Sequence, residues 1–232
     1  MSIFIAVLIA MNVPQIFLSV MILPGAKLSW WIQVILAILF CATYALAGYW
    51  AYHLLKNAAV TPIFSNFNLR NWRKVWWLFF MWLLMMAIVM VFRMLNMHLT
   101  GVKTTDNQHA IEMLMSTLSI PMVTMVIYGV FLAPVVEEII FRGLILNYFF
   151  RHQWWWSNII LSGFLFALPH VFIPTSLATF IDYLMYMSMG MILAYIYKRT
   201  GRLQDNIAVH MLNNGISMIP ILITLIVKTV IK

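Results

Sequence analysis

The stretch APVVEEIIFRG, residues Ala133–Gly143, places two adjacent glutamates and an arginine inside a long apolar run. The residues before it, IPMVTMVIYGVFL, carry no charge, and neither does the LILNYFF that follows. Glu137 and Glu138 are two of only six acidic residues in the chain. A charge at the bilayer centre costs about 2.5–3.5 kcal/mol, and such groups are functional by default. The stretch therefore predicts a functional polar site within a hydrophobic helix.

The composition is that of an integral membrane protein. Of the 232 residues, 64% are hydrophobic and 9% are charged, against about 45–50% and about 25% in soluble globular chains. The mean hydropathy is +0.95. We expect an all-α fold, a polytopic helical bundle in which residues 1–232 form a single integral-membrane domain. The one cysteine, Cys41, excludes an intrachain disulfide.

Several apolar stretches reach the roughly 20 residues that a transmembrane helix needs. Tryptophan pairs and runs at their ends are typical of the aromatic belt at membrane interfaces. We predict about seven spans, namely Ile3–Leu23, Trp30–Leu54, Val75–Met97, Ser119–Phe150, Trp154–Phe172, Leu177–Tyr197 and Asn206–Val230. The fourth is too long for one straight crossing, so we expect it to tilt, to break near Pro134 or to project from the membrane.

The net charge of +8 indicates contact with anionic lipid rather than nucleic acid. Basic residues gather in the loops after the predicted spans two, four and six, where they are Lys56, Arg70, Arg73, Lys74, Arg151, Lys198, Arg199 and Arg202. By the positive-inside rule, this predicts a multi-pass protein of the cell membrane with a cytoplasmic N-terminus. Lys228 and Lys232 near the other terminus favour instead a six- or eight-span count, which would bring that end inside.

Helical geometry places the two adjacent glutamates on different faces of the helix. Glu138 and Arg142 are an i,i+4 pair on one face of a helix, with the glutamate first. Glu137 has Phe141 at i+4 and no basic partner there. The Glu138 carboxylate is then neutralised and held by Arg142, while the Glu137 carboxylate is desolvated and free to act as a general base. The alternative is that both glutamates share Arg142 and simply lock helices together.

Two histidines within predicted spans complete a candidate site. His170 ends the stretch FALPH, while His210 begins HMLNN and shares a helical face with Asn214. Glu137 lies about 14 residues before the predicted turn at Arg151–His152 and His170 about 18 after it. At about 1.5 Å per residue, they differ in depth by roughly 6 Å, or one helical turn. We expect Glu137 and His170 to face each other at similar depth.

Several intramembrane protease classes do not fit these residues. Neither HVFIP nor HMLNN matches the HExxH of zinc proteases. Asp182 lacks the context of an intramembrane aspartyl protease, and Ser162 lacks that of a rhomboid. A carboxylate base with a histidine can activate water against a peptide carbonyl. Histidine and asparagine donors from another helix can then stabilise the oxyanion.

Three motifs occur in order: EEIIFR fits EExxxR, FALPH fits FxxxH and HMLNN fits HxxxN. In this order and spacing they resemble the CPBP family, the CAAX-processing and bacteriocin-processing intramembrane endopeptidases, also called the Abi family. The resemblance covers about Pro121–Ile219, which we take as the peptidase motif core at about 121–219. It implies that Glu137 activates water with His170, that Glu138 and Arg142 orient the site, and that His210 and Asn214 form the oxyanion hole.

The resemblance leaves the metal question open, because the family has been described both as metalloproteases and as metal-independent glutamate proteases. Glu137, His170 and His210 are the residues that would ligate zinc in principle. We expect no cofactor, with zinc as the alternative. The CAAX substrate of eukaryotic members does not carry over, since only the catalytic motifs match.

Three functions compete at this point. The first is an endopeptidase that acts on a membrane-associated or hydrophobic peptide, such as a bacteriocin leader or a pheromone precursor. The second is a non-catalytic immunity or peptide-binding protein of the same family. The third is a transporter whose charged cluster moves protons, but it would predict inverted repeats, and the sequence contains none that we can detect.

Overall fold

The structure is a computed structural model, and it describes residues 2–23, 25, 27–58, 64, 72–148 and 155–230. These residues form helices and connections, and no strand occurs among them. The elements are α1 (Ser2–Asn12), α2 (Gln15–Met21), α3 (Trp30–Ala58), α4 (Trp72–Thr100), α5 (Asp106–Leu114), α6 (Ile120–Ile127), η1 (Tyr128–Leu132), α7 (Ala133–Glu138), η2 (Ile139–Leu144), α8 (Ile145–Tyr148), α9 (Trp155–Ala167), α10 (Leu177–Thr200) and α11 (Leu203–Val230). The predicted all-α class is confirmed, and the chain is a multi-pass membrane protein.

The predicted count of seven spans is not confirmed. Within the described residues, five helical segments are long and apolar enough to cross a membrane. The first predicted span is divided into α1 and α2 at Pro14, which lacks the N–H that a continuous helix needs. The fifth predicted span corresponds to α9, whose 13 residues reach only about 20 Å. It ends at Ala167 because the residue before Pro169 is disfavoured in the helical conformation.

The fourth predicted span stays helical from α6 to α8 and does not break at Pro134. Instead it widens into two π-helical segments, η1 and η2, on either side of α7. At the end of η1, the Ala133 N–H donates to Tyr128 O, five residues back. The next such bond would need an N–H on Pro134, so the carbonyl of Gly129 is left without its helical donor. The predicted turn at Arg151–His152 lies outside the described residues.

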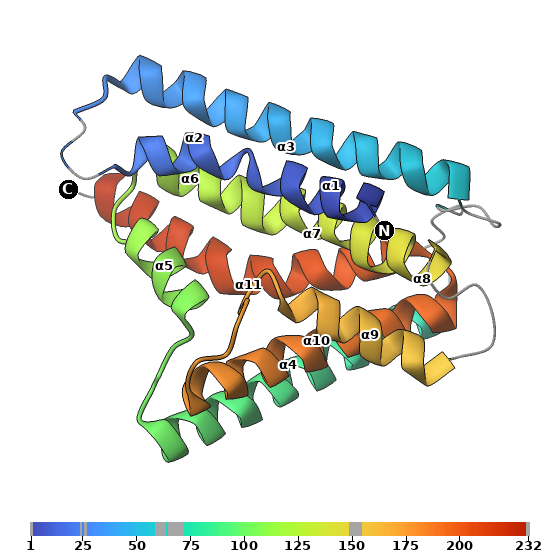
Figure 1. Cartoon of the computed structure of the whole chain (residues 1–232). Coiled ribbons are helices and arrows are strands. Elements are labelled where there is room, and N and C mark those ends of the chain that lie inside the picture. The colour runs from blue at the N-terminus through green and yellow to red at the C-terminus, as the bar shows by residue number, and fades with distance from the viewer. Residues whose placement is uncertain are drawn as a thin grey trace.

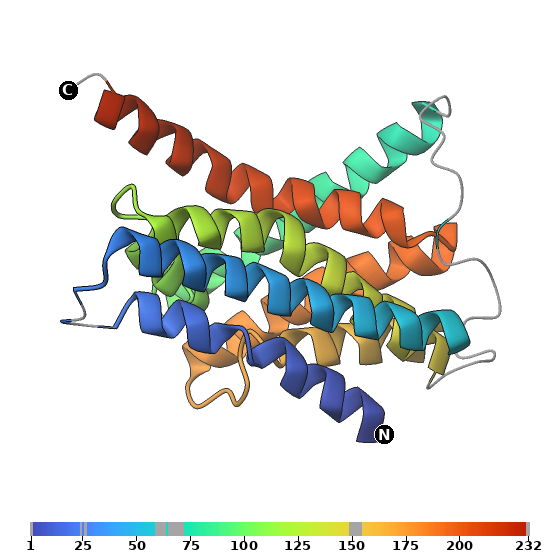
Figure 2. The same ribbon diagram turned by 90° about the horizontal axis from the view of Figure 1, so that it is seen from above.

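The α6–α8 segment runs through the middle of the bundle. Figure 1 shows α3 along one side of it, with α11 on the other side, and α4, α9 and α10 beyond α11. Helix α10 packs against both α9 and α4, and it also contacts α11 and η2. Figure 2 shows α11 running past α6 and α7 and then diverging from the bundle towards its C-terminal end. This arrangement brings α7, η2, α10 and α11 together at one place, where the polar residues lie.

Two glycines allow α9 and α10 to approach closely. A Cβ on Gly163 would lie 2.6 Å from the backbone oxygen of Met187, and one on Gly190 would lie 2.8 Å from the Cα of Gly163. Small residues at such crossings are typical of membrane helix pairs. The contact fixes α10 against α9, and with it the carbonyl of Gly190 that the site uses.

Replacing Gly163 with alanine is expected to destabilise the bundle, because the added methyl group meets backbone that cannot yield. Overpacking of this kind typically costs about 1–3 kcal/mol. The matched control is Gly215→Ala, where the nearest atom to the new Cβ is Ile219 Cδ1 at 3.4 Å. Thermal unfolding in detergent should give a lower Tm for Gly163→Ala and an unchanged or higher Tm for Gly215→Ala. Equal Tm values would contradict the close approach of α9 and α10.

Candidate active site

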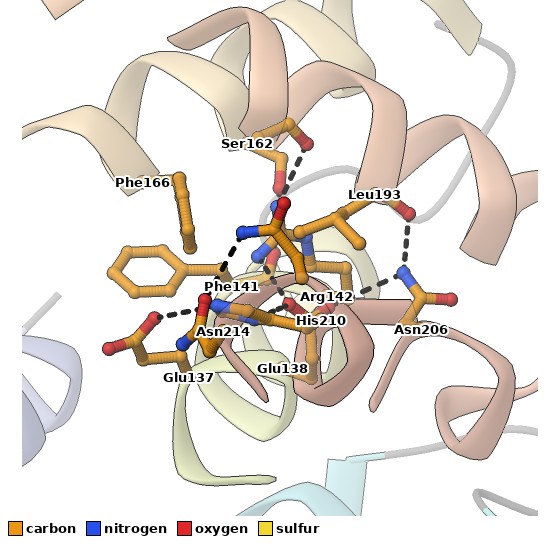
Figure 3. Close-up of polar contacts among 12 residues, drawn as sticks. Glu137, Glu138, Phe141, Arg142, Ser162, Phe166, Leu193, Asn206, His210 and Asn214 are labelled. Atoms are coloured by element: carbon orange, nitrogen blue, oxygen red, sulfur yellow. Dashed lines mark hydrogen bonds and ion pairs between the residues drawn. The ribbon is translucent and has the colours of Figure 1, made fainter. Parts of the chain in front are cut away.

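The three sequence motifs converge in the interior of the bundle. Glu137 and Glu138 come from α7, Arg142 from η2, and His210 and Asn214 from α11, as Figure 3 shows. His170 follows α9 in the connection to α10. The polar side chains on α7, η2 and α11 form one connected network, and His170 reaches it through aromatic contacts.

Glu138 lies at the centre of this network and has no exposed side-chain surface. Its Oε1 accepts a hydrogen bond from Arg142 Nη1 at 3.0 Å, as the i,i+4 spacing predicted. The same oxygen lies 3.0 Å from His210 Nδ1. Its Oε2 accepts from Asn206 Nδ2 at 3.3 Å. The buried carboxylate is thus satisfied by donors from two elements besides its own.

The Arg142 side chain is also fully buried. Nη1 binds Glu138, while Nη2 donates to the carbonyl of Gly190 on α10 at 2.8 Å. The guanidinium carbon lies 4.5 Å from the centroid of the Phe166 ring, which is a cation–π contact. Within the described part of the chain, Arg142 therefore pairs with Glu138 and is not shared with Glu137.

Removal of one partner of this ion pair is expected to be strongly destabilising, because it leaves an uncompensated charge in an apolar site. Arg142→Ala and Glu138→Ala should each lower the unfolding free energy by about 3–5 kcal/mol. The double variant should lose much less than the sum of the two. A double-mutant cycle by chemical denaturation in detergent checks the coupling, and strictly additive losses would mean that the pair is not coupled.

His210 lies between the two glutamates. In Figure 3, dashed lines join it to both carboxylates. An ionised carboxylate can only accept a hydrogen bond, so His210 Nδ1 must carry the proton and donate to Glu138, which fixes the orientation of the ring. Nε2 then faces Glu137, whose Oε2 lies 3.9 Å away. The Glu137 side chain is 13% exposed and that of Glu138 0%, so Glu137 is the carboxylate that a substrate can reach.

His170 is held by its own backbone neighbourhood. Its Nδ1 lies 3.0 Å from the carbonyl oxygen of Phe166, which can only accept, so Nδ1 carries the proton and Nε2 is an acceptor. The ring stacks on Tyr186 at 4.3 Å and lies 4.9 Å from the Phe166 ring. Phe166 in turn contacts the His210 ring at 5.8 Å. Within the part of the chain that the structure describes, no hydrogen bond or ion pair joins His170 to Glu137.

Asn214 binds a backbone carbonyl of η1 that has no helical donor. Its Nδ2 donates to the carbonyl of Gly129 at 2.7 Å, the group that Pro134 leaves without a helical donor. Its Oδ1 accepts from Nδ2 of Asn213 at 3.2 Å. One N–H of the Asn214 amide is thereby engaged and the second is available.

Asn206 is a site residue that the three motifs do not include. Its Nδ2 lies between Glu138 Oε2 and the carbonyl of Leu193, to which it makes a short hydrogen bond. The signal was present in the sequence, because Asn206, His210 and Asn214 repeat at i, i+4 and i+8 on one helical face. The Gly190 carbonyl gave no such signal. Phe166 begins the FxxxH motif, but its contacts with Arg142 and His210 arise from packing between helices.

The candidate zinc ligands Glu137, His170 and His210 are not gathered into a metal-binding group among the residues that the structure describes. Among the described residues, no group of three histidine, cysteine, aspartate or glutamate side chains has an arrangement that would hold a metal ion. His210 already directs Nδ1 to Glu138 and Nε2 to Glu137, and His170 directs Nδ1 to a carbonyl. Metal-bound histidines also make such bonds at Nδ1 and coordinate through Nε2, so these bonds are compatible with either form and a metal-free site stays a prediction.

The fold and the site define a class of protein, a helical membrane protein with a buried glutamate–histidine–arginine centre. Residues 119–216 match the family model of Rce1-like proteins, described as type II CAAX prenyl endopeptidase Rce1-like. This segment contains all six candidate residues, and its match to a CAAX protease family model agrees with the resemblance that the motifs indicated. The family indicates an intramembrane protease. A search of curated proteins and a search of solved structures each found no significant match.

Proposed function

We propose that this protein is an intramembrane endopeptidase that hydrolyses a peptide bond of a membrane-associated or hydrophobic peptide with water activated by Glu137. The observation that carries the proposal is the unequal environment of the two adjacent glutamates. Glu138 is occupied by Arg142, Asn206 and His210. Among the described residues, Glu137 makes no hydrogen bond of this kind, lies 3.9 Å from His210 Nε2 and is the more exposed carboxylate.

In this mechanism, Glu137 accepts a proton from water as the water oxygen attacks the scissile carbonyl carbon. A C–O bond forms, and the carbonyl π electrons move onto oxygen to give the tetrahedral oxyanion. When this intermediate collapses, the C–N bond breaks and the proton held by Glu137 passes to the leaving amine. The products are a carboxylic acid and an amine, and Glu137 returns to its carboxylate form.

The histidines and Asn214 serve the same reaction in complementary ways. His170 retains an acceptor at Nε2, which suits it to hold the attacking water together with Glu137. His210 can donate from Nε2 when its ring is protonated, and Asn214 keeps one N–H beyond the bond to Gly129. Both are then available to the oxyanion. Glu138 and Arg142 keep His210 in place and do not take part in proton transfer.

A surface groove supports a hydrophobic substrate. It has a volume of about 910 Å³ and lies between α3 and α6–η1. Its lining is almost entirely apolar, and it extends from Leu118 and Ser119 to Leu132, the last residue of η1 before α7. Within this substrate class we propose a bacteriocin leader or a pheromone precursor, with a self-immunity role as the biological alternative. The prenylated CAAX peptide named in the family description is a further candidate.

Glu137→Gln removes the proton acceptor and preserves the size of the side chain, so cleavage should fall by about 10²-fold or more. The assay would use purified protein in nanodiscs with three probes, namely a farnesylated CAAX peptide, the same peptide without the lipid, and a hydrophobic bacteriocin leader peptide. Product masses identify the cleaved bond. The control is Glu112→Gln, an exposed glutamate on α5, which should cleave like the wild type.

Full turnover by Glu137→Gln would remove Glu137 from the mechanism. A wild-type protein that binds one of these peptides tightly and cleaves none would favour the alternative function, a non-catalytic immunity or peptide-binding protein. Thermal unfolding of Glu137→Gln should stay near that of the wild type, which excludes misfolding as the cause of lost activity.

We propose that the reaction uses no metal ion, in line with the placement of Glu137, His170 and His210. Exhaustive chelation should then leave cleavage of the same peptide intact, and elemental analysis should give much less than one zinc per chain. The contrary result is activity and stoichiometric metal that are lost together and both restored by zinc. That result would make the protein a metalloprotease.

We propose a location in the cell membrane with the N-terminus on the cytoplasmic side. The start of α1 lies at the end of the bundle where α3 and α10 finish (Figure 1), and Lys56, Lys198 and Arg199 lie in the last turns of α3 and α10. At the same end, Lys74 and Arg202 pair with the buried Asp205. Cysteine labelling of the two membrane faces would test this orientation.

A further inference from the structure

His170 lies in the connection that follows α9, so its side chain needs support from outside its own segment. Helix α9 ends at Ala167, whose carbonyl accepts the backbone N–H groups of His170 and Val171 at 3.0 and 2.9 Å. The Nδ1 bond to the Phe166 carbonyl holds one edge of the ring, but a single hydrogen bond leaves the ring free to turn about it. The direction of Nε2 therefore depends on what lies against the faces of the ring.

Tyr186 supplies that support from α10. Its ring stacks on the imidazole of His170, with the centroids 4.3 Å apart and the planes inclined by 26°. The Phe166 ring also contacts the imidazole, at 4.9 Å and 35°. Because Phe166 belongs to α9 and also carries the carbonyl that binds Nδ1, it moves together with that restraint. The contact with Tyr186 is the one that ties His170 to a second helix.

The position of Tyr186 on α10 relates His170 to the buried ion pair. Gly190 is four residues later, so it lies on the same face of the helix, about 6 Å further along the axis. Its carbonyl accepts from Arg142 Nη2 at 2.8 Å, and Arg142 binds Glu138 through Nη1. One face of α10 therefore holds both the Arg142–Glu138 pair and the stacked ring of His170.

The hydroxyl of Tyr186 makes a contact of its own. It lies 3.3 Å from Thr105 Oγ1, and both side chains are buried. Thr105 caps α5, because its Oγ1 also accepts the backbone N–H of Gln108 at 3.0 Å. The hydroxyl contact thus joins α10 to the start of α5, which lies before the matched segment 119–216. A phenylalanine could stack on His170 equally well, so the contact with Thr105 is what the hydroxyl adds.

We propose that Tyr186 is a positioning residue, which holds the His170 ring with Nε2 directed towards the water beside Glu137. Thr105 holds Tyr186 in turn through the hydroxyl contact. This inference rests on the proposed endopeptidase function, in which His170 helps to hold that water. Tyr186 touches neither water nor substrate in this role, and no bond to it forms or breaks. The matched segment 119–216 then does not contain every residue on which the reaction depends.

The first test separates the stacked ring from the hydroxyl, with whichever peptide the wild type cleaves as the probe. Tyr186→Leu removes the ring and should lower kcat by about 10²-fold with KM nearly unchanged, since a misplacement of about 1 Å can cost that much. Tyr186→Phe keeps the stack, so its kcat should lie within about tenfold of the wild-type value, which is the effect of one neutral hydrogen bond. The matched control is Tyr183→Leu, which removes a buried tyrosine that also joins α10 to α9. It should lower the Tm about as much as Tyr186→Leu and leave kcat near that of the wild type.

A second test asks whether Tyr186 acts through His170. On a His170→Ala background, Tyr186→Leu should cause no further loss of the remaining cleavage, because residues that act as a unit are not additive. If the two losses multiply instead, Tyr186 has a general structural role and the proposal is wrong. By the same reasoning, Thr105→Val combined with Tyr186→Phe should lower kcat no more than Thr105→Val does alone.

A third measurement does not depend on turnover. NMR spectra of protein with ¹⁵N-labelled histidine distinguish the two imidazole tautomers, and His170→Ala assigns the signal. His170 should carry its proton on Nδ1 in the wild type, in Tyr186→Phe and in Tyr183→Leu, whereas Tyr186→Leu should give a mixture of tautomers. A single Nδ1–H tautomer in Tyr186→Leu overturns the positioning role, and so does a wild-type kcat for that variant.

The two levels of inference fail differently. If the wild type cleaves none of the peptides, the endopeptidase function fails, and the tautomer measurement alone decides whether Tyr186 holds the His170 ring. If the wild type cleaves and Tyr186→Leu cleaves equally well, the function stands and only the role of Tyr186 is rejected.

Discussion

A single buried carboxylate, that of Glu138, organises the interior of this protein. An ionised group in an apolar bundle carries a desolvation penalty of several kcal/mol unless charge and hydrogen bonds compensate it. Here the compensation comes from Arg142 on η2 and from Asn206 and His210 on α11. Arg142 then needs its own second acceptor, which is the Gly190 carbonyl of α10. The requirement to satisfy one charge therefore fixes three elements relative to α7, and it also fixes the orientation of the His210 ring.

The backbone contributes to the same network through its irregular segments. In a membrane, every buried carbonyl must find a donor within the protein. The π-helical segment η1 and Pro134 leave the Gly129 carbonyl without one, and Asn214 supplies it. In η2, the Phe141 carbonyl accepts from Ser162 Oγ of α9 at 3.0 Å. Such π-helical turns are frequent at functional sites, and here they attach α9 and α11 to the helix that carries both glutamates.

The chemistry follows from a difference between neighbours in the sequence. Glu137 and Glu138 are adjacent, but successive residues on a helix point about 100° apart. That rotation turns Glu138 into the polar network and leaves Glu137 facing His210 Nε2 at 3.9 Å with part of its surface exposed. Helix α3, which lies outside the family match, packs against α7 at Val136, the residue before Glu137.

The sequence alone determined the features that depend on composition and on local helical geometry. Hydropathy gave the membrane class and the helical segments, and i,i+4 spacing gave the Glu138–Arg142 pair and the shared face of Asn206, His210 and Asn214. The order of the motifs indicated the family. The sequence did not determine that the first span divides at Pro14 or that α9 is too short to cross a membrane. It also did not determine that the helix continues through Pro134 by widening into π-helical segments. Only the tertiary structure decided that His210 lies beside Glu137, that the second acceptor of Arg142 is the Gly190 carbonyl, and that α3 packs against α7 at Val136. The physical reason is that contacts within a helix follow from its fixed rise and rotation, whereas contacts between helices depend on how each one is rotated and set in depth by close packing.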